Sequence, residues 1–222
     1  GSNEAPSVIQ TYGEAEITAK PDQATISIEI ETRNTSAEEA AAENAHLTNA
    51  VREALFACGL TEDEVKTGSY LMYSYRESPV FYPELGRVDT DLKEETIYYQ
   101  AYNEIIATIS EIDQVGEIID IAIGAGANRI NYLSFDLKES EELKMEALKA
   151  ATEQALRKAE AVASGAGVEI QGVFSVKEER TGYSPFRLEQ DMAQEMAAGD
   201  SSTPIAPQDI KITASVIAEY RF

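Results

Sequence analysis

The segment from residue 209 to the last residue of the sequence alternates apolar and polar side chains without interruption. Its apolar positions are Ile210, Ile212, Ala214, Val216, Ala218, Tyr220 and Phe222. Because successive side chains of a β-strand point to opposite faces, this pattern predicts a strand with one face in a core. We expect the strand to lie beside a central strand and to close the fold, so removal of residues 209–222 should unfold the domain.

Helical and strand periodicities divide the rest of the chain into a mixed set of elements. Alternating residues predict strands over residues 25–32, 69–75, 96–109, 133–137 and 168–178. Apolar spacings of three and four residues predict helices over residues 36–59, 111–123 and 140–164. The predicted fold class is α+β, with mixed, mainly antiparallel sheets and three helices. The strand, helix, strand order of residues 24–75 recurs in residues 96–137, which is compatible with a structural duplication.

Local signals set the ends of the first helix and the packing of the last. Ser36 and Glu39 have the spacing of a capping box, and Gly59 supplies a left-handed stop. One side of the last helix consists of Ala147, Ala151, Ala155, Ala159 and Val162. Because most of these side chains are small, we expect another element to approach this helix closely.

The domain organisation follows from where the periodicity breaks. Residues 1–7 are interpreted as a tag remnant, Gly1-Ser2, followed by a flexible lead-in that is compatible with a removed export signal or a lipid anchor on the precursor. Residues 8–222 are predicted to form a single domain. Two long polar excursions, at about residues 76–95 and 180–208, are predicted to be loops, the first with the character of a hairpin tip.

The acidity of the chain limits its partners. The formal net charge is -22, from 40 acidic and 18 basic side chains, so the protein repels phosphate backbones and anionic lipid headgroups. We therefore expect no nucleic-acid binding. No run of apolar residues approaches the length of a spanning helix, so no membrane span is predicted.

Residues suited to chemistry are scarce. His46 is the only histidine and Cys58 the only cysteine, which excludes a histidine or thiolate metal cluster and an internal disulfide. We expect His46 on a helix surface or partly buried, and Cys58 as a small core residue. The glycine-containing run at residues 124–128 ends a helix, so it predicts a helix stop and not a phosphate-binding turn. No catalytic, cofactor-binding or metal-binding residue is assigned, and no cofactor is expected.

Aromatic side chains gather around the first long excursion, in a chain with 11 tyrosines and no tryptophan. Tyrosine combines apolar area with a polar tip, which suits both the face of a sheet and an interface with a subunit or ligand. Both interpretations remain open. The residues singled out for an interface are Tyr73, Tyr75, Phe81, Tyr82, Tyr98 and Tyr99.

Several segments of the chain form a recognisable set in their order and spacing. They are residues 8–17, 20–26, 36–40, 100–103, 115–120, 122–128 and 209–216, together with Ala155, Lys158, Ala159 and Ala163. In this set the chain resembles the SIMPL domain family of bacterial cell-envelope proteins. The resemblance covers residues 8 to 222, and the two long excursions depart from any recognised pattern.

The resemblance implies an exported, periplasmic or envelope-associated bacterial protein and brings no catalytic residues with it. Some family members are linked to oxidative-stress tolerance, and some form large homo-oligomers. We therefore expect a non-enzymatic protein that acts through self-association, as a homo-oligomer, or through an envelope protein partner. The alternative is a small-molecule-binding or hydrolytic domain that uses carboxylates and tyrosines in a cleft between the two excursions.

Overall fold

The computed structural model describes residues 4–79, 81–88, 95–189 and 204–222. Within these ranges the chain forms two compact units. The first unit is drawn from Gly1–Asp22, Asp136–Phe186 and Pro207–Phe222. The second is drawn from Gln23–Phe135 and Arg187–Ala206. Both are α+β, as predicted, and in each the helices lie on one face of the larger antiparallel sheet.

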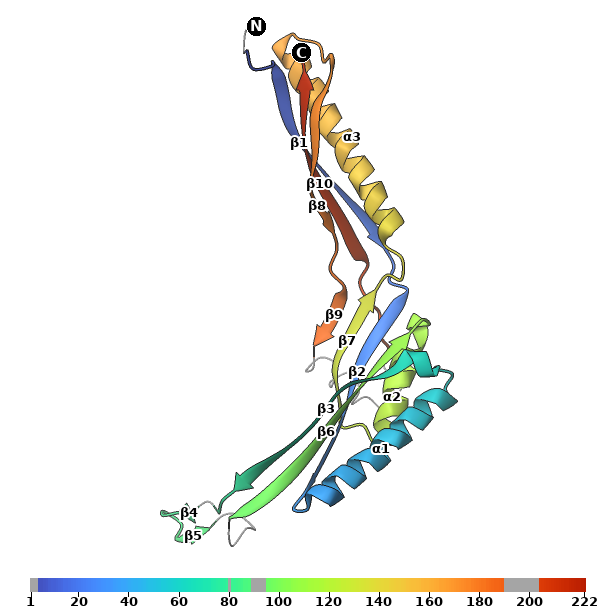
Figure 1. Ribbon diagram of the computed structural model, residues 1–222, viewed down its shortest axis with the longest axis vertical. Helices are drawn as coiled ribbons and strands as arrows, with labels where there is room; N and C mark the ends of the chain where they lie inside the picture. The colour runs from blue at the N-terminus through green and yellow to red at the C-terminus, as the bar shows by residue number, and fades with distance from the viewer. Residues whose placement is uncertain (1–3, 80, 89–94, 190–203) are drawn as a thin grey trace. The chain divides into compact units, whose positions relative to one another are not determined.

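The first unit is a three-stranded sheet with one long helix lying along it (Figure 1). In spatial order its strands are β1 (Val8–Ala19), β10 (Ile210–Arg221) and β8 (Gly172–Gly182), and its helix is α3 (Glu141–Ala166). The predicted C-terminal strand is confirmed, and its alternate residues from Ile210 to Tyr220 are buried. The buried position predicted for Phe222 is wrong, because Phe222 follows the end of β10 and is 40% exposed. Its predicted place beside a central strand is wrong, because β10 pairs with β1 on one side and β8 on the other and is itself central.

Helix α3 approaches β1 closely because both elements present small residues. The buried positions of α3 are Ala147, Ala151, Ala155, Ala159 and Ala163. A Cβ atom on Gly13 of β1 would lie 1.9 Å from the Ala151 carbonyl oxygen, so only glycine fits there. The predicted inclusion of Val162 in this stripe is wrong, since Val162 is 50% exposed. The buried residues keep a spacing of four along the helix and continue to Ala163 instead.

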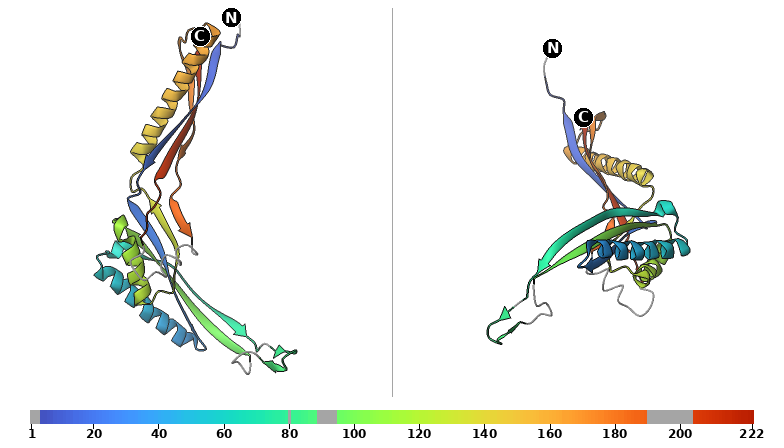
Figure 2. Two further views of the ribbon diagram at one scale, coloured as in Figure 1. Left: turned by 180° about the vertical axis from the view of Figure 1, so that it is seen from behind. Right: turned by 60° about the horizontal axis from the view of Figure 1, so that its bottom comes forward.

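The second unit contains a five-stranded antiparallel sheet. In spatial order its strands are β3 (Val65–Glu77), β6 (Thr96–Ile109), β2 (Gln23–Asn34), β7 (Arg129–Asp136) and β9 (Phe186–Glu189). The helices α1 (Ala37–Ala57) and α2 (Val115–Ala125) lie against the same face of this sheet (Figure 2). Short 3-10 turns, η1 (Glu62–Glu64) and η2 (Ile112–Gln114), precede β3 and α2.

The order of strands in this sheet reveals two interleaved strand, helix, strand units. β6 lies between the two strands of β2-α1-β3, and β2 lies between the two strands of β6-α2-β7. This is the split arrangement of a ferredoxin-like β-α-β-β-α-β unit. The repeated order of elements predicted from the sequence is therefore confirmed. The core between sheet and helices is built from residues such as Ile26, Ile28, Ile30 and Ile105, which are completely buried.

The predicted ends of α1 and α2 have clear causes. Ser36 caps α1, and its hydroxyl accepts a hydrogen bond from the Glu39 backbone N–H at 3.3 Å. The reciprocal bond of the expected capping box is made by another residue, since the Ser36 backbone N–H donates to Asn34 at 2.9 Å. Gly126, with φ of 128°, follows α2 and ends it, which confirms the helix stop predicted in residues 124–128.

Several boundaries differ from the predicted ones. Strands β1 and β9 were not predicted. Strand β8 starts and ends later than the strand predicted over residues 168–178. In the first long excursion the described residues include the end of β3 and a small hairpin of β4 (Phe81–Tyr82) and β5 (Arg87–Val88). The second excursion contains the end of β8 and all of β9, while residues 190–203 lie outside the described residues.

Candidate interaction surface

Three of the tyrosines singled out from the sequence lie together on the face of the second sheet that points away from α1 and α2. Tyr75 and Tyr98 are directly opposite each other on β3 and β6, with ring centres 5.7 Å apart in a stacked arrangement. Tyr73 follows on the same face, with its ring centre 6.3 Å from that of Tyr75. Paired residues of neighbouring strands share a face, so the strand register alone brings these rings together.

Arg33 of β2 completes this cluster. Its guanidinium carbon lies 4.2 Å from the centre of the Tyr98 ring, which is the geometry of a cation–π contact. Its Nη1 donates to the Tyr75 hydroxyl at 2.8 Å, and the same nitrogen lies 3.5 Å from a Glu77 carboxylate oxygen. The hydrogen bond to Tyr75 is the main cause of the raised pKa of Arg33. Arg33 was not predicted, because nothing in its local sequence separates it from an ordinary surface arginine.

The other predicted interface residues do not join the cluster. Tyr99 alternates onto the opposite face of β6, the side on which α1 lies, where it is paired with Asn34 of β2. Phe81 and Tyr82 form β4, and their side chains lie outside the described part of the structure. The structure thus groups Tyr73, Tyr75 and Tyr98 and separates Tyr99 from them.

The cluster adjoins exposed apolar side chains of β3. Leu71 lies on the same face as Tyr73, and their side chains are 54% and 43% exposed. Tyr70, on the opposite face, is 54% exposed. We call Arg33, Leu71, Tyr73, Tyr75 and Tyr98 the tyrosine surface. Large, rigid, amphipathic side chains beside an arginine are the composition that protein interfaces favour.

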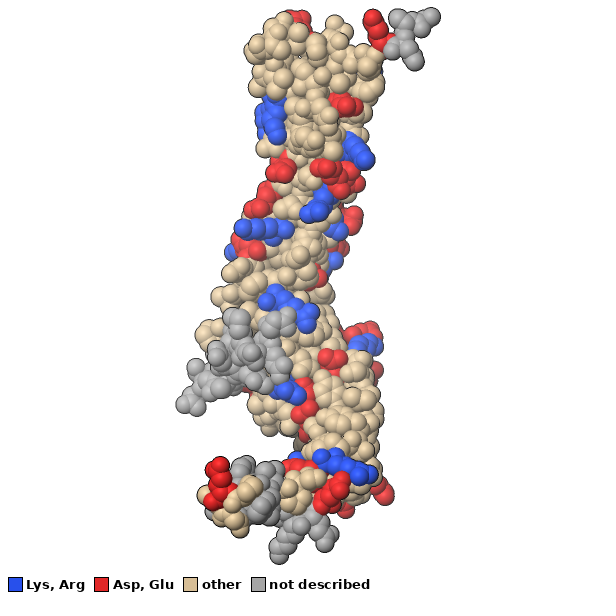
Figure 3. All heavy atoms as spheres, turned by 90° about the vertical axis from the view of Figure 1, so that its left-hand side faces the viewer, with Lys and Arg blue, Asp and Glu red and all other residues tan. Residues whose placement is uncertain are grey.

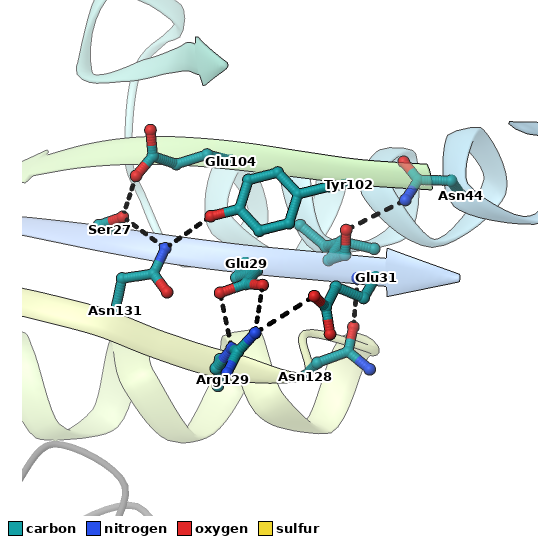
Figure 4. Close-up of polar contacts among 10 residues, drawn as sticks. Ser27, Glu29, Glu31, Asn44, Tyr102, Glu104, Asn128, Arg129 and Asn131 are labelled. Carbon is teal, nitrogen blue, oxygen red and sulfur yellow. Dashed lines mark hydrogen bonds and ion pairs between the residues drawn. The ribbon is translucent and has the colours of Figure 1, made fainter. Parts of the chain in front are cut away.

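Figure 4 shows a partly buried polar network that includes Glu29 and Glu31 of β2. By alternation along β2, these two residues lie on the same face of the sheet as Arg33 and the tyrosine surface. Arg129 Nε and Nη2 donate to the two carboxylate oxygens of Glu29 at 2.6 and 2.7 Å. Arg129 Nη2 also donates to Glu31 at 3.2 Å, and the Glu31 backbone N–H donates to Asn128 at 2.6 Å. Because Glu29 is only 1% exposed, the two-point contact with Arg129 replaces the water contacts that its side chain loses on burial.

The second part of this network connects β2, β6 and β7. The amide of Asn131 donates to Ser27 at 3.2 Å and to the Tyr102 hydroxyl at 3.1 Å. The Ser27 hydroxyl in turn donates to Glu104. Burial raises the pKa of Tyr102, and burial together with Glu29 raises the pKa of Glu31. These contacts join three neighbouring strands on the face that carries the tyrosine surface.

The residues with nucleophilic or basic chemistry are dispersed. His46 is exposed on α1, as expected. Cys58 caps the C-terminus of α1 and is half-buried, so the core position expected for it is only partly reached. Burial raises the pKa of the Cys58 thiol, which lowers its reactivity. Within the described ranges, no three His, Cys, Asp or Glu residues are grouped as a metal site would require.

A shallow hollow of about 620 Å³ lies in the first unit, beside the ends of β8 and β10. Its lining includes Arg180, Tyr183, Asp209 and Lys211. The Tyr183 hydroxyl donates to Asp136 at 2.7 Å, and Lys144 lies 5.7 Å from the ring centre of Tyr183. Basic and acidic side chains are interspersed on the surface seen in Figure 3. The hollow therefore offers mixed charge and hydrogen-bonding groups.

Fold and surface together define an α+β protein of two compact units with an exposed tyrosine and arginine cluster on one sheet. The chain belongs to the SIMPL family, described as a protein of unknown function (DUF541), whose model matches residues 9–220. The resemblance found in the sequence segments is therefore confirmed over nearly the whole chain.

Two relatives illustrate the family. The 26 kDa periplasmic immunogenic protein of Brucella melitensis is 27% identical over 215 residues, which cover 95% of this chain and 83% of the relative. The uncharacterized protein YggE of Escherichia coli K12 is 26% identical over 208 residues, which cover 94% of this chain and 78% of the relative. No helix within the described residues combines the length and the apolar character needed to cross a membrane.

Proposed function

We propose that this chain is a non-enzymatic protein of the bacterial periplasm or cell envelope that acts through self-association, with binding of an envelope protein partner as the second route. Membership of the SIMPL family and similarity to a protein named as periplasmic support the location. A contribution to tolerance of oxidative or envelope stress, implied by the family resemblance, belongs to the same proposal.

The observation that carries this proposal is the tyrosine surface. Its rings are ordered by stacking and by the Arg33 contacts, yet Leu71 and Tyr73 remain about half exposed. Rigid aromatic side chains lose little conformational entropy on binding. An exposed group of aromatic side chains that is already ordered is therefore suited to binding another protein.

Solution mass of wild type and two single variants tests the proposal. We expect the wild type to sediment as a multiple of 24.2 kDa. Tyr73→Ser should raise the dissociation constant of the assembly by about tenfold or more, the effect of an interface hot spot. Tyr12→Ser is the matched control, since Tyr12 is 51% exposed on β1, outside the tyrosine surface. Equal dissociation constants for both variants would exclude the tyrosine surface from the interface.

The hollow beside β8 and β10 favours a second candidate, a small-molecule-binding function. Arg180 and Lys211 lie in its lining with Tyr183, a combination that suits an anionic ligand with a hydrogen-bond acceptor. Titration calorimetry with inorganic phosphate and short dicarboxylates tests this candidate. Binding to the wild type that Arg180→Gln weakens would support it, and absence of heat at millimolar concentrations would contradict it.

A further inference from the structure

The outer edge of β3 is a long strand edge without a neighbour among the described residues. β3 spans 13 residues at one end of the five-stranded sheet and pairs only with β6. On the outer side, alternate residues of an edge strand present backbone N–H and C=O groups that can pair with another strand. Natural proteins usually protect such edges with charges, prolines, bulges or covering side chains.

The edges of the first sheet show such protection. On β1, the Tyr12 carbonyl oxygen accepts a hydrogen bond from Lys158 Nζ at 2.5 Å, and the Glu14 backbone N–H donates to Gln154 at 2.6 Å. Side chains of α3 therefore occupy the middle of that edge. On β8, register shifts interrupt the pairing with β10, and residues 177–180 are all charged.

The edge of β3 has one such feature, a register shift between Thr67 and Ser69 near its start, and lacks comparable protection over the rest of its length. From residue 67 to residue 75 it contains neither a charged side chain nor a proline, and its charged residues, Lys66, Arg76 and Glu77, lie at the two ends. Tyr70 and Leu71 in the middle are each 54% exposed, on opposite faces of the sheet. A neutral, partly apolar edge of this length is suited to strand addition.

We propose that the outer edge of β3 pairs antiparallel with β3 of a second copy of this chain, so that two five-stranded sheets become continuous. This inference rests on the proposed self-association and specifies its geometry. A two-fold axis makes the same edge serve both copies, and it places the two tyrosine surfaces side by side on one face of the joined sheet.

Charge favours a second copy as the occupant at this edge. Two chains that each carry a net charge of -22 repel one another, so a neutral stretch is where their backbones approach at the lowest electrostatic cost. In an antiparallel pair centred near Tyr70, Arg76 of one copy lies opposite Glu64 of the other, the residue just before β3. The Arg76 side chain is 70% exposed and lies 3.2 Å from Glu95, so much of its surface is accessible to the second copy.

Hydrogen exchange of β3 amides, combined with lysine substitutions at the edge, tests the proposal. In the wild type we expect slow exchange at both alternating sets of amides between residues 67 and 75, increasing with protein concentration. In Tyr70→Lys/Leu71→Lys, only the set bonded to β6 should remain slow, and the mass should fall to 24.2 kDa. Tyr12→Lys/Leu156→Lys is the matched control, since both residues are exposed in the other unit, and it should behave as the wild type.

The outcomes separate the edge from self-association in general. An assembly that persists unchanged in Tyr70→Lys/Leu71→Lys would overturn the edge pairing while leaving self-association intact. Slow exchange of both amide sets in a protein that remains at 24.2 kDa would show that the edge is covered from within the same chain, and would also overturn it. Far-ultraviolet circular dichroism and the Tm of the lysine variant establish that it remains folded.

Discussion

Gly13 lies so close to α3 that a single added methyl group should destabilise the first unit. In Gly13→Ala the new Cβ would lie 1.9 Å from the Ala151 carbonyl oxygen, whereas ordinary contact begins at 3.4 Å. To remove this clash, β1 and α3 would have to move apart by about 1.5 Å, because the clashing atom belongs to the helix backbone and cannot rotate away. That movement would also break the 2.7 Å hydrogen bond from the buried Thr11 hydroxyl to the Ala155 carbonyl oxygen.

The two effects give the expected magnitude. Overpacking of a core costs about 1–3 kcal/mol, and loss of a buried hydrogen bond costs about 1 kcal/mol, so we expect Gly13→Ala to destabilise the first unit by about 3 kcal/mol. At about 4–8 °C per kcal/mol for a unit of this size, the Tm of its calorimetric transition should fall by about 12 °C or more.

Gly165→Ala is the matched control for this prediction. Gly165 lies within α3, and a Cβ atom there would meet nothing within 4 Å. Alanine has a higher helix propensity than glycine, so Gly165→Ala should stabilise the unit by up to about 1 kcal/mol. Its Tm should therefore equal or exceed that of the wild type. A Gly13→Ala protein whose Tm matches that of the wild type would refute the close packing of β1 on α3.

Three further predictions concern the polar network and the last strand. Arg129→Leu leaves the buried Glu29 carboxylate without its partner and should cost about 3 kcal/mol in urea denaturation, with part of the loss recovered by adding Glu29→Leu. Because the folded-state pKa of Glu31 is raised, its stabilising contribution is present below the ordinary glutamate pKa of about 4.3 and is lost as pH rises through the folded-state value. Glu31→Gln should therefore exceed the wild type in stability at pH 7 and match it at pH 3. Deletion of residues 209–222 removes the central strand of the first sheet, so the transition of that unit should disappear from calorimetry.

The elements predicted most accurately are those whose own residues contain the alternation or the capping residue that defines them. The strand predicted over residues 96–109 coincides with β6, because its apolar side chains alternate from end to end. The start of α1 was predicted because Ser36 supplies its cap within the same segment. In β1 the residues facing α3 include Thr11 and Gly13, which lack apolar bulk, so alternation gives little sign of this strand.

The candidate site was predicted only in part, because some of its residues are far apart in the sequence. Tyr73, Tyr75 and Tyr98 were found because aromatic residues near one excursion are visible in composition. Placing Arg33 among them requires the β2–β6 and β3–β6 registers, which no local pattern contains. The ion pair of Glu29 with Arg129 joins residues 100 positions apart, and only the split strand order brings them together.

The mass of the wild-type protein in solution tests the central claim most directly. Sedimentation equilibrium over a range of micromolar concentrations should give a mass that rises with concentration towards a multiple of 24.2 kDa. A mass of 24.2 kDa at every concentration would contradict self-association and, with it, the pairing of β3 edges.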